Sequence, residues 1–229
     1  MIRSRDLILE NLADVRGRIA AAAAEAGRDP SAVALVAVGK TVEAEALGWV
    51  VAAGVRDLGE NYVRELRAKA REVAGARWHF IGRLQSSSAH HVAEIADVVQ
   101  TVVPGRAAAR LAARAVRVGR TIPVLIEIDL AARGSGVGAA DVADACDAVA
   151  RLEGLELHGL MTVPPPLEEA EAARPFFRQL RQLRDEVAER HPRALELSMG
   201  MSLDYEVAVG EGATMVRIGT ALFGARPPA

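Results

Sequence analysis

The sequence predicts a single α/β domain, a (β/α)8 barrel of the TIM type with an extra helix at its amino end. Three observations lead to this prediction: eight short apolar runs, helical segments between them, and a length of 229 residues. Strands that alternate with helices of this length form parallel βαβ units. Eight such units in a chain of this size favour a closed barrel over an open doubly wound sheet, which is the alternative. No charged or Pro/Gly/Ser-rich linker divides the chain, so we expect one domain over residues 1–229.

The periodicity of apolar residues assigns each element in turn. Residues 4–27 are patterned as a helix, because Leu12, Val15 and Ile19 recur at helical spacing and Gly27 provides a stop. The strand-like runs lie at 33–38, 55–58, 78–81, 98–102, 124–128, 155–161, 195–198 and 215–218. The predicted helices between them lie at 42–53, 60–75, 87–96, 104–119, 139–152, 168–190 and 203–211, with a short helical tail after residue 219.

Unusual residues gather where the predicted strands end. Lys40 ends the first strand, Asn61 follows the second and Met161 closes the sixth. Hydroxyls and glycines follow the last two strands, at 198–202 and 219–220. Active sites of this fold lie at the carboxyl ends of the strands, and phosphate groups commonly bind after strands seven and eight. The sequence therefore predicts a functional site at this end of the barrel.

Composition excludes several classes of protein. The formal net charge of -2 argues against nucleic-acid binding, which needs a surplus of Lys and Arg on one face. The amino-terminal residues lack the apolar run of a signal peptide. No stretch reaches the roughly 18 uncharged apolar residues of a membrane span. Cys146 is the only cysteine, which suits a reducing compartment. We expect a cytoplasmic globular protein.

Lysine occurs at only two positions, Lys40 and Lys69, and arginine supplies every other basic residue. Arg cannot replace Lys where an uncharged amine must attack a carbonyl, because the guanidinium stays protonated. Lys69 lies in the charged helical segment 64–71 and is predicted to be solvated. Lys40 follows Gly39, but a phosphate-binding P-loop would also need glycine at position 34, which is Ala34.

Two interpretations of Lys40 follow from its place at the end of a central strand. Strand periodicity places it on the same face as Val36 and Val38, and apolar surroundings favour the uncharged amine that attacks an aldehyde. The alternative is a structural lysine that pairs with a carboxylate at the barrel rim. Glycines and hydroxyls at 198–200 and 218–220 favour the first interpretation, because their backbone N–H groups can approach an anion closely. A lysine beside a phosphate cradle predicts pyridoxal phosphate held as a Schiff base on Lys40.

Six motifs, spread over nearly the whole chain, resemble those of the pyridoxal phosphate homeostasis protein family, also described as YggS-like. They are AVGKT at 37–41, GENYV at 59–63, WHFIG at 78–82, GLMTVP at 159–164, LSMGMS at 197–202 and MVRIGT at 215–220. The resemblance implies a barrel like the N-terminal domain of alanine racemase, without that enzyme's second domain. It also implies a role in vitamin B6 balance rather than an established catalytic turnover.

The resemblance also assigns roles to individual residues. It implies a Schiff base on Lys40, a phosphate held by Ser198, Gly219 and Thr220, a ring near Asn61 and Met161, and Arg217 facing the pyridine nitrogen. An arginine only donates hydrogen bonds, so it favours an unprotonated pyridine nitrogen, which is a poorer electron sink. We therefore expect a monomeric cofactor-binding protein that buffers pyridoxal phosphate or delivers it to apoenzymes, and not an enzyme.

Two other functions stay open. One is a pyridoxal phosphate-dependent racemase or decarboxylase, and the other is a barrel that binds a different phosphorylated ligand non-covalently. The histidines show no metal-ligand spacing, and His79 is predicted to be a hydrogen-bonded interior residue. The chain also departs from the family: Ser87 and Ser88 stand where relatives usually have Asn-Lys, and the loop at 133–136 has lost the usual lysine. Any role of a second lysine in those loops does not carry over.

Overall fold

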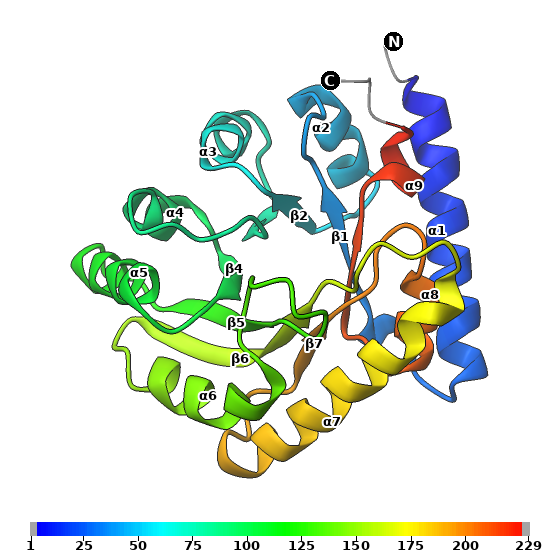
Figure 1. The fold of residues 1–229 in the computed structure, drawn as a ribbon. Coiled ribbons are helices and arrows are strands. Elements are labelled where there is room, and N and C mark those ends of the chain that lie inside the picture. Colours follow the sequence, from blue (N-terminus) through cyan, green and yellow to red (C-terminus); the bar gives the residue numbers. More distant parts are fainter. Residues whose placement is uncertain (1–3, 226–229) are drawn as a thin grey trace.

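The computed structural model describes residues 4–225 and is a closed parallel barrel of eight strands (Figure 1). Neighbouring strands follow one another in sequence order, and β8 pairs with β1 to close the barrel. The strands are β1 (Ala34–Val38), β2 (Asp57–Glu60), β3 (Arg77–Phe80), β4 (Val98–Val102), β5 (Ile122–Ile128), β6 (Leu155–Thr162), β7 (Glu196–Ser198) and β8 (Met215–Ile218). The predicted closed barrel is confirmed.

Helices surround the barrel in the predicted order. They are α1 (Arg5–Glu25), α2 (Ala44–Ala52), α3 (Val63–Glu72), α4 (Ala89–Ile95), α5 (Arg106–Arg117), α6 (Val142–Ala150), α7 (Arg174–Arg190), α8 (Tyr205–Gly210) and α9 (Thr220–Phe223). The predicted helix at 60–75 begins only at Val63, because Glu60 still belongs to β2. The segment predicted as one helix at 168–190 consists of a 3-10 turn, Ala170–Ala173, followed by α7.

The extra helix α1 lies outside the ring and packs beside α8, α9 and α2 (Figure 1). Ser4 caps its amino end by accepting a hydrogen bond from the backbone N–H of Leu7. Its buried face consists of Ile8, Leu12, Val15, Ile19 and Ala23, spaced three or four residues apart. The side chain of Asn11 donates to the carbonyl of Leu222, which ties α1 to the last helix. This helix therefore supports the elements that close the barrel.

Alternation along the strands separates two apolar clusters. Val36 belongs to a small cluster inside the barrel, whereas its neighbour Ala37 belongs to the large cluster between strands and helices. The interior cluster consists of Val36, Val98, Leu125, Met161 and Met215. Within residues 4–225, none of the helices combines the length and the apolar character that crossing a membrane requires.

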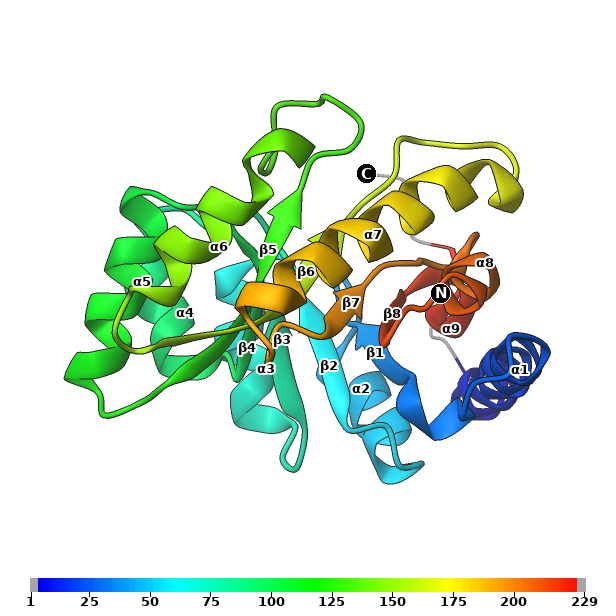
Figure 2. The same ribbon diagram turned by 90° about the horizontal axis from the view of Figure 1, so that it is seen from below.

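The carboxyl ends of the strands open at one end of the barrel. The loops after β5 and β6 project from this end (Figure 2). The register of β1 and β8 aligns Ala37 with Ile218, so that the loop after β1 and the loop after β8 begin side by side. The fold thus places the loop that carries Lys40 next to the loop that leads into α9.

Candidate functional site

Lys40 lies at the mouth of the barrel, two residues after β1. It is half-buried, and its Nζ atom lies 5.1 Å from the centre of the Tyr62 ring, close enough for a cation–π contact. Tyr62 itself is 50% exposed. The next residue, Thr41, has a φ of 61°, an uncommon conformation for a non-glycine residue. Lys40 is therefore only partly buried, and the residue that follows it has an unusual backbone conformation.

The prediction that Lys69 is solvated is wrong. Its side chain runs from α3 into the barrel rim, and the residue is only 8% exposed. Its Nζ donates to the carbonyl of Gly39 at 2.7 Å, to Glu60 Oε1 at 2.7 Å and to Glu65 Oε2 at 2.6 Å. Three acceptors match the three donors of an ammonium group, so the buried charge is fully partnered. Lys69 is therefore a structural lysine that pairs with two carboxylates at the barrel rim.

The Lys69 cluster grips the backbone on both sides of Lys40. Lys69 holds the carbonyl of Gly39, and Glu65 accepts the backbone N–H of Thr41 at 3.0 Å. A Cβ atom at position 39 would lie 2.7 Å from Glu60 Oε1, so the carboxylate approaches as closely as glycine allows. We call Glu60, Glu65 and Lys69 the loop clamp.

The two carboxylates of the loop clamp have opposite pKa shifts. Burial raises the pKa of Glu60, and the bond from Lys69 offsets this only in part. Burial also acts to raise the pKa of Glu65, but hydrogen bonds from Lys69 and Thr41 outweigh it and the net pKa is lowered. Glu65 is therefore the carboxylate that holds its negative charge most firmly.

The loops after β7 and β8 meet at the start of α9. Gly200 has a φ of 90°, and a Cβ there would lie 2.5 Å from Cβ of Ala208, so this sharp turn requires glycine. Ser202 accepts the backbone N–H of Ala221 at 3.0 Å, which places its hydroxyl at the first turn of α9 beside the exposed Thr220. Gly219 lies against Val38, in ordinary contact with β1. Backbone N–H groups, two hydroxyls and a close-packed glycine thus share one corner of the mouth, within reach of the Lys40 loop.

Arg217 points into the barrel from β8 and is 4% exposed. Its guanidinium donates to Ser198 Oγ at 2.6 Å and to the carbonyl of Thr162 at 2.8 Å. Burial lowers the pKa of Arg217 to about 10, and the negative charges of Asp204 and Glu127 oppose that shift. It remains a cation at neutral pH, and these two bonds use only two of the five N–H donors of a guanidinium.

Ser198 is fully buried, and its hydroxyl faces the barrel interior. It accepts from Arg217 and donates to Gln100 Oε1 at 2.6 Å. Both bonds are made within the protein, so a contribution of Ser198 to a phosphate site stays a prediction. His79 is fully buried, with Nδ1 2.7 Å from Gln100 Nε2 and Nε2 2.8 Å from Asp57 Oδ1. The prediction of a hydrogen-bonded interior histidine is confirmed.

The two remaining predicted residues, Met161 and Asn61, also lie near the carboxyl ends of their strands. Met161 is 2% exposed and belongs to the interior apolar cluster, near the carboxyl end of β6. Asn61 is half-buried directly after β2. A Cβ atom at position 82 would lie 1.8 Å from the carbonyl oxygen of Asn61. Only glycine at position 82 therefore allows the loop after β3 to pack against the backbone of Asn61. The predicted residues therefore come from β1, β2, β6, β7 and β8, all near the carboxyl end.

Sequence reasoning missed Gln100 and Lys69 as members of this region. Gln100 had a visible signal, since it interrupts the apolar run 98–102 at a position that faces inward. Ser202 belongs to the segment 198–202, which the sequence already predicts at this end of the barrel. Lys69 had no such signal, because a lysine among helical charges usually lies on a solvated face.

Comparisons with known proteins place the chain in a family. Residues 11–227 match the family described as alanine racemase, N-terminal domain. The chain is 43% identical over 223 residues to the pyridoxal phosphate homeostasis protein of Pseudomonas aeruginosa, and the match covers 96% of each chain. It belongs to the pyridoxal phosphate homeostasis protein family. It is also 42% identical to the family member of Escherichia coli K12, over 96% of this chain and 97% of that one.

A solved structure of a related protein supports the family assignment. PipY of Synechococcus elongatus PCC7942, described with PLP bound, superimposes with a TM-score of 0.83 at 35% identity, over 95% of this chain and all of that one. Alanine racemase of Clostridium difficile 630 shares the fold alone, with a TM-score of 0.75 at 16% identity. The match covers 97% of this chain but 58% of the racemase. This member of the homeostasis family therefore spans the barrel part of the longer enzyme.

Proposed function

We propose that this chain binds pyridoxal 5'-phosphate as a Schiff base on Lys40 and acts in intracellular pyridoxal phosphate homeostasis. The observation that carries the proposal is the position of Lys40, at the barrel mouth beside the corner formed by the loops after β7 and β8. A related protein of the same family and fold is known with PLP bound.

The residues of the mouth fit the parts of this cofactor. The corner of Gly219, Thr220 and Ser202 offers backbone N–H groups and hydroxyls, which suit a phosphate. Arg217 offers N–H donors, which suit an acceptor such as an unprotonated pyridine nitrogen. Asn61 and Met161 would border the ring, and Ser198 would act through its bond to Arg217. When bound, the cofactor supplies an aldehyde that reacts with primary amines.

We infer that this barrel stores or delivers the cofactor rather than turning over a substrate. An arginine opposite the pyridine nitrogen favours the unprotonated ring, which stabilises a substrate carbanion poorly. Release to a pyridoxal phosphate-dependent apoenzyme would require an incoming amine to displace Lys40, and the half-buried position of Lys40 at the mouth is consistent with such an approach. We propose a single barrel domain that works as a monomer.

Titration of the protein with pyridoxal phosphate tests the proposal. We expect a yellow absorption band that borohydride removes. Lys40→Arg keeps the positive charge but cannot form a Schiff base, so we expect it to lose the band and retain only weak binding through the phosphate. A protein with Lys40→Arg that keeps the band would refute the assignment. If the unsubstituted chain bound pyridoxal phosphate without forming any absorption band, a non-covalent phosphate site would be favoured instead.

Exchange at the α-carbon of amino acids tests the absence of turnover. Incubation of the loaded protein with common amino acids in deuterium oxide should leave their α-hydrogens in place. Rapid and stereochemically complete exchange would favour a racemase.

A further inference from the structure

A chain of hydrogen bonds crosses the barrel interior from Arg217 to the amino end of the strands. From Arg217 it passes through the hydroxyl of Ser198, the amide of Gln100 and the ring of His79 to the carboxylate of Asp57. Every separation along it lies between 2.6 and 2.8 Å. The five residues are between 0% and 7% exposed. We call this set the interior chain.

The chemistry of its members gives the interior chain one direction. An arginine only donates, so Ser198 accepts from Arg217 and its own hydrogen goes to Gln100 Oε1. The amide nitrogen of Gln100 also only donates, so His79 Nδ1 is the acceptor and carries no hydrogen. The ring hydrogen is then on Nε2 and is donated to Asp57. Each donor thus points from the cation at the carboxyl end towards the anion at the amino end.

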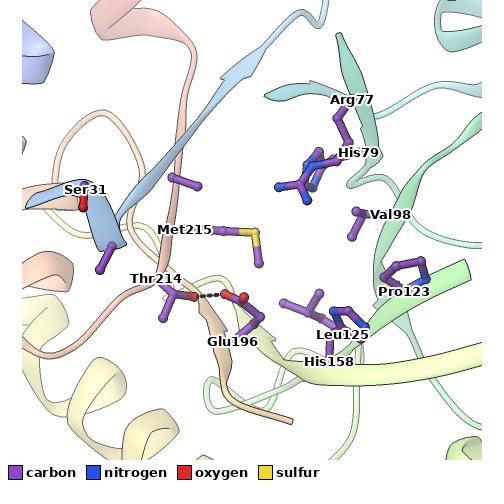
Figure 3. Close-up of a pocket in the computed structure, with 12 residues that line it drawn as sticks. Ser31, Arg77, His79, Val98, Pro123, Leu125, His158, Glu196, Thr214 and Met215 are labelled. Atoms are coloured by element: carbon purple, nitrogen blue, oxygen red, sulfur yellow. Dashed lines mark hydrogen bonds between the residues drawn. The ribbon is translucent and has the colours of Figure 1, made fainter. Parts of the chain in front are cut away.

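The far end of the interior chain reaches a second opening of the barrel. Asp57 also accepts from Arg77 at 2.6 Å, and both are the first residues of their strands. Arg77 and His79 line a cavity of about 240 Å³ at this end, together with Met215 and Leu125 (Figure 3). The second hydrogen of Gln100 Nε2 points to the sulfur of Met215 at 3.8 Å. The chain is therefore embedded in the interior apolar cluster.

The interior chain can orient the guanidinium of Arg217. The direct partners of the Arg217 guanidinium, Ser198 Oγ and the Thr162 carbonyl, are neutral, so its buried charge is oriented through them. Each bond of an aligned chain polarises the next in a low-dielectric interior. Loss of one member leaves a buried donor and a buried acceptor without partners, which costs more than the bond itself contributes.

We propose that Gln100 and His79 are positioning residues for Arg217, which they hold through Ser198 in the orientation that donates to the pyridine nitrogen. This inference rests on the proposed function, because it assumes that Arg217 faces that nitrogen. It extends the cofactor site to residues that make no contact with the cofactor.

The state of His79 tests the interior chain without any cofactor. In the protein labelled with ¹⁵N-histidine, we expect His79 to be a neutral ring with its hydrogen on Nε2. His79→Asn assigns its signals among those of the five histidines. A hydrogen on Nδ1, or a ring protonated at both nitrogens at neutral pH, would overturn the direction of the chain.

Gln100→Leu tests the coupling to the site. With pyridoxal phosphate labelled at the ring nitrogen, we expect the ¹⁵N resonance of the bound cofactor to move and its affinity to fall about tenfold, the size of a hydrogen bond to a charged group. The matched control is Leu125→Val, since Leu125 is fully buried in the same cluster but makes none of these bonds. We expect it to lower stability and leave the resonance in place. Equal shifts in both variants would reduce Gln100 to a packing residue and overturn the proposal.

Two further variants keep the test decisive. In the background Arg217→Met, Gln100→Leu should cause no further loss of affinity, because the residue that it positions is absent. Fully additive losses would overturn the proposal. Asp57→Asn is nearly isosteric and lies at the opposite end of the barrel, so it is expected to fold even if Gln100→Leu does not. We expect a smaller shift of the same resonance in the same direction, and no shift would overturn the proposal.

The two ideas fail in different ways. A chain that takes up no pyridoxal phosphate would refute the proposed function, while the ¹⁵N-histidine spectrum would still report on the interior chain. A chain that forms the Schiff base but shows an unmoved ring resonance in Gln100→Leu would refute the positioning role alone.

Discussion

Lys40 and Lys69 are the two lysines of this chain, and they differ in burial and in the groups that their amines contact. Lys40 is half-buried at the open mouth and has an aromatic ring beside its amine. Lys69 is buried, and all three of its donors are bound to oxygen atoms. The amine of Lys69 is held by two carboxylates, which suits a structural role. The amine of Lys40 contacts an aromatic ring, and this weaker contact can be broken when the amine reacts. The comparison indicates that one lysine serves to hold the other in place.

The largest effect is expected from Lys69→Met. Removal of the ammonium leaves the buried Glu60 and the partly buried Glu65 without their shared cation, and it leaves the Gly39 carbonyl without its donor. Breaking a buried ion pair by removing one partner costs about 3–5 kcal/mol. Urea denaturation should show a loss of this size, together with weaker pyridoxal phosphate binding at the intact Lys40. A loss of unfolding free energy below about 1 kcal/mol would contradict a stabilising role of the loop clamp.

Gly39→Ala sharpens the comparison by disturbing the loop clamp from the other side. The added Cβ would lie 2.7 Å from Glu60 Oε1 and 2.9 Å from Leu47 Cδ1. Overpacking of this kind costs about 1–3 kcal/mol, measurable as a lower denaturation midpoint. The matched control is Gly48→Ala in α2, where no atom lies within 4 Å of the added Cβ. There we expect a gain of up to about 1 kcal/mol, because alanine is the better helix former. Equal outcomes at the two positions would contradict the close approach at Gly39.

A smaller effect separates the two carboxylates by pH. The folded-state pKa of Glu65 is lowered, so its charge stabilises the protein above the ordinary value of 4.5 and this contribution is lost as the pH falls through the lowered value. The folded-state pKa of Glu60 is raised, so its contribution is complete below 4.5 and declines as the pH rises through the raised value.

Unfolding free energies of Glu65→Gln and Glu60→Gln between pH 3 and pH 7 measure this difference. Relative to the unsubstituted protein, Glu65→Gln should change the slope on the acid side of 4.5, and Glu60→Gln on the neutral side. Identical profiles for the two variants would contradict the assignment of opposite shifts.

Much of the fold could be predicted because the barrel strands are written as apolar runs. Each of the eight predicted strands overlaps an observed one, and the inward face of Val36 followed from alternation alone. The site could be predicted in outline, since strand ends of a parallel barrel share one face. Glu65 and Lys69 are four residues apart on one helix, a spacing that allows them to pair but does not show that Lys69 is buried.

The rest depended on contacts between distant segments. Nothing in the sequence near Lys69 shows that the carbonyl of Gly39, thirty residues earlier, needs a donor. Likewise, the bond between Gln100 and Ser198 joins residues 98 positions apart. Such partners follow from barrel closure and register, which local patterns do not specify.

The location of the borohydride-fixed cofactor tests the central claim most directly. After reduction and proteolysis, mass spectrometry can distinguish a peptide with residue 40 from one with residue 69, the only two lysines of the chain. The account predicts one equivalent of reduced cofactor on Lys40 and none on Lys69. An adduct on Lys69, or cofactor that stays bound but leaves Lys40 unmodified, would contradict it.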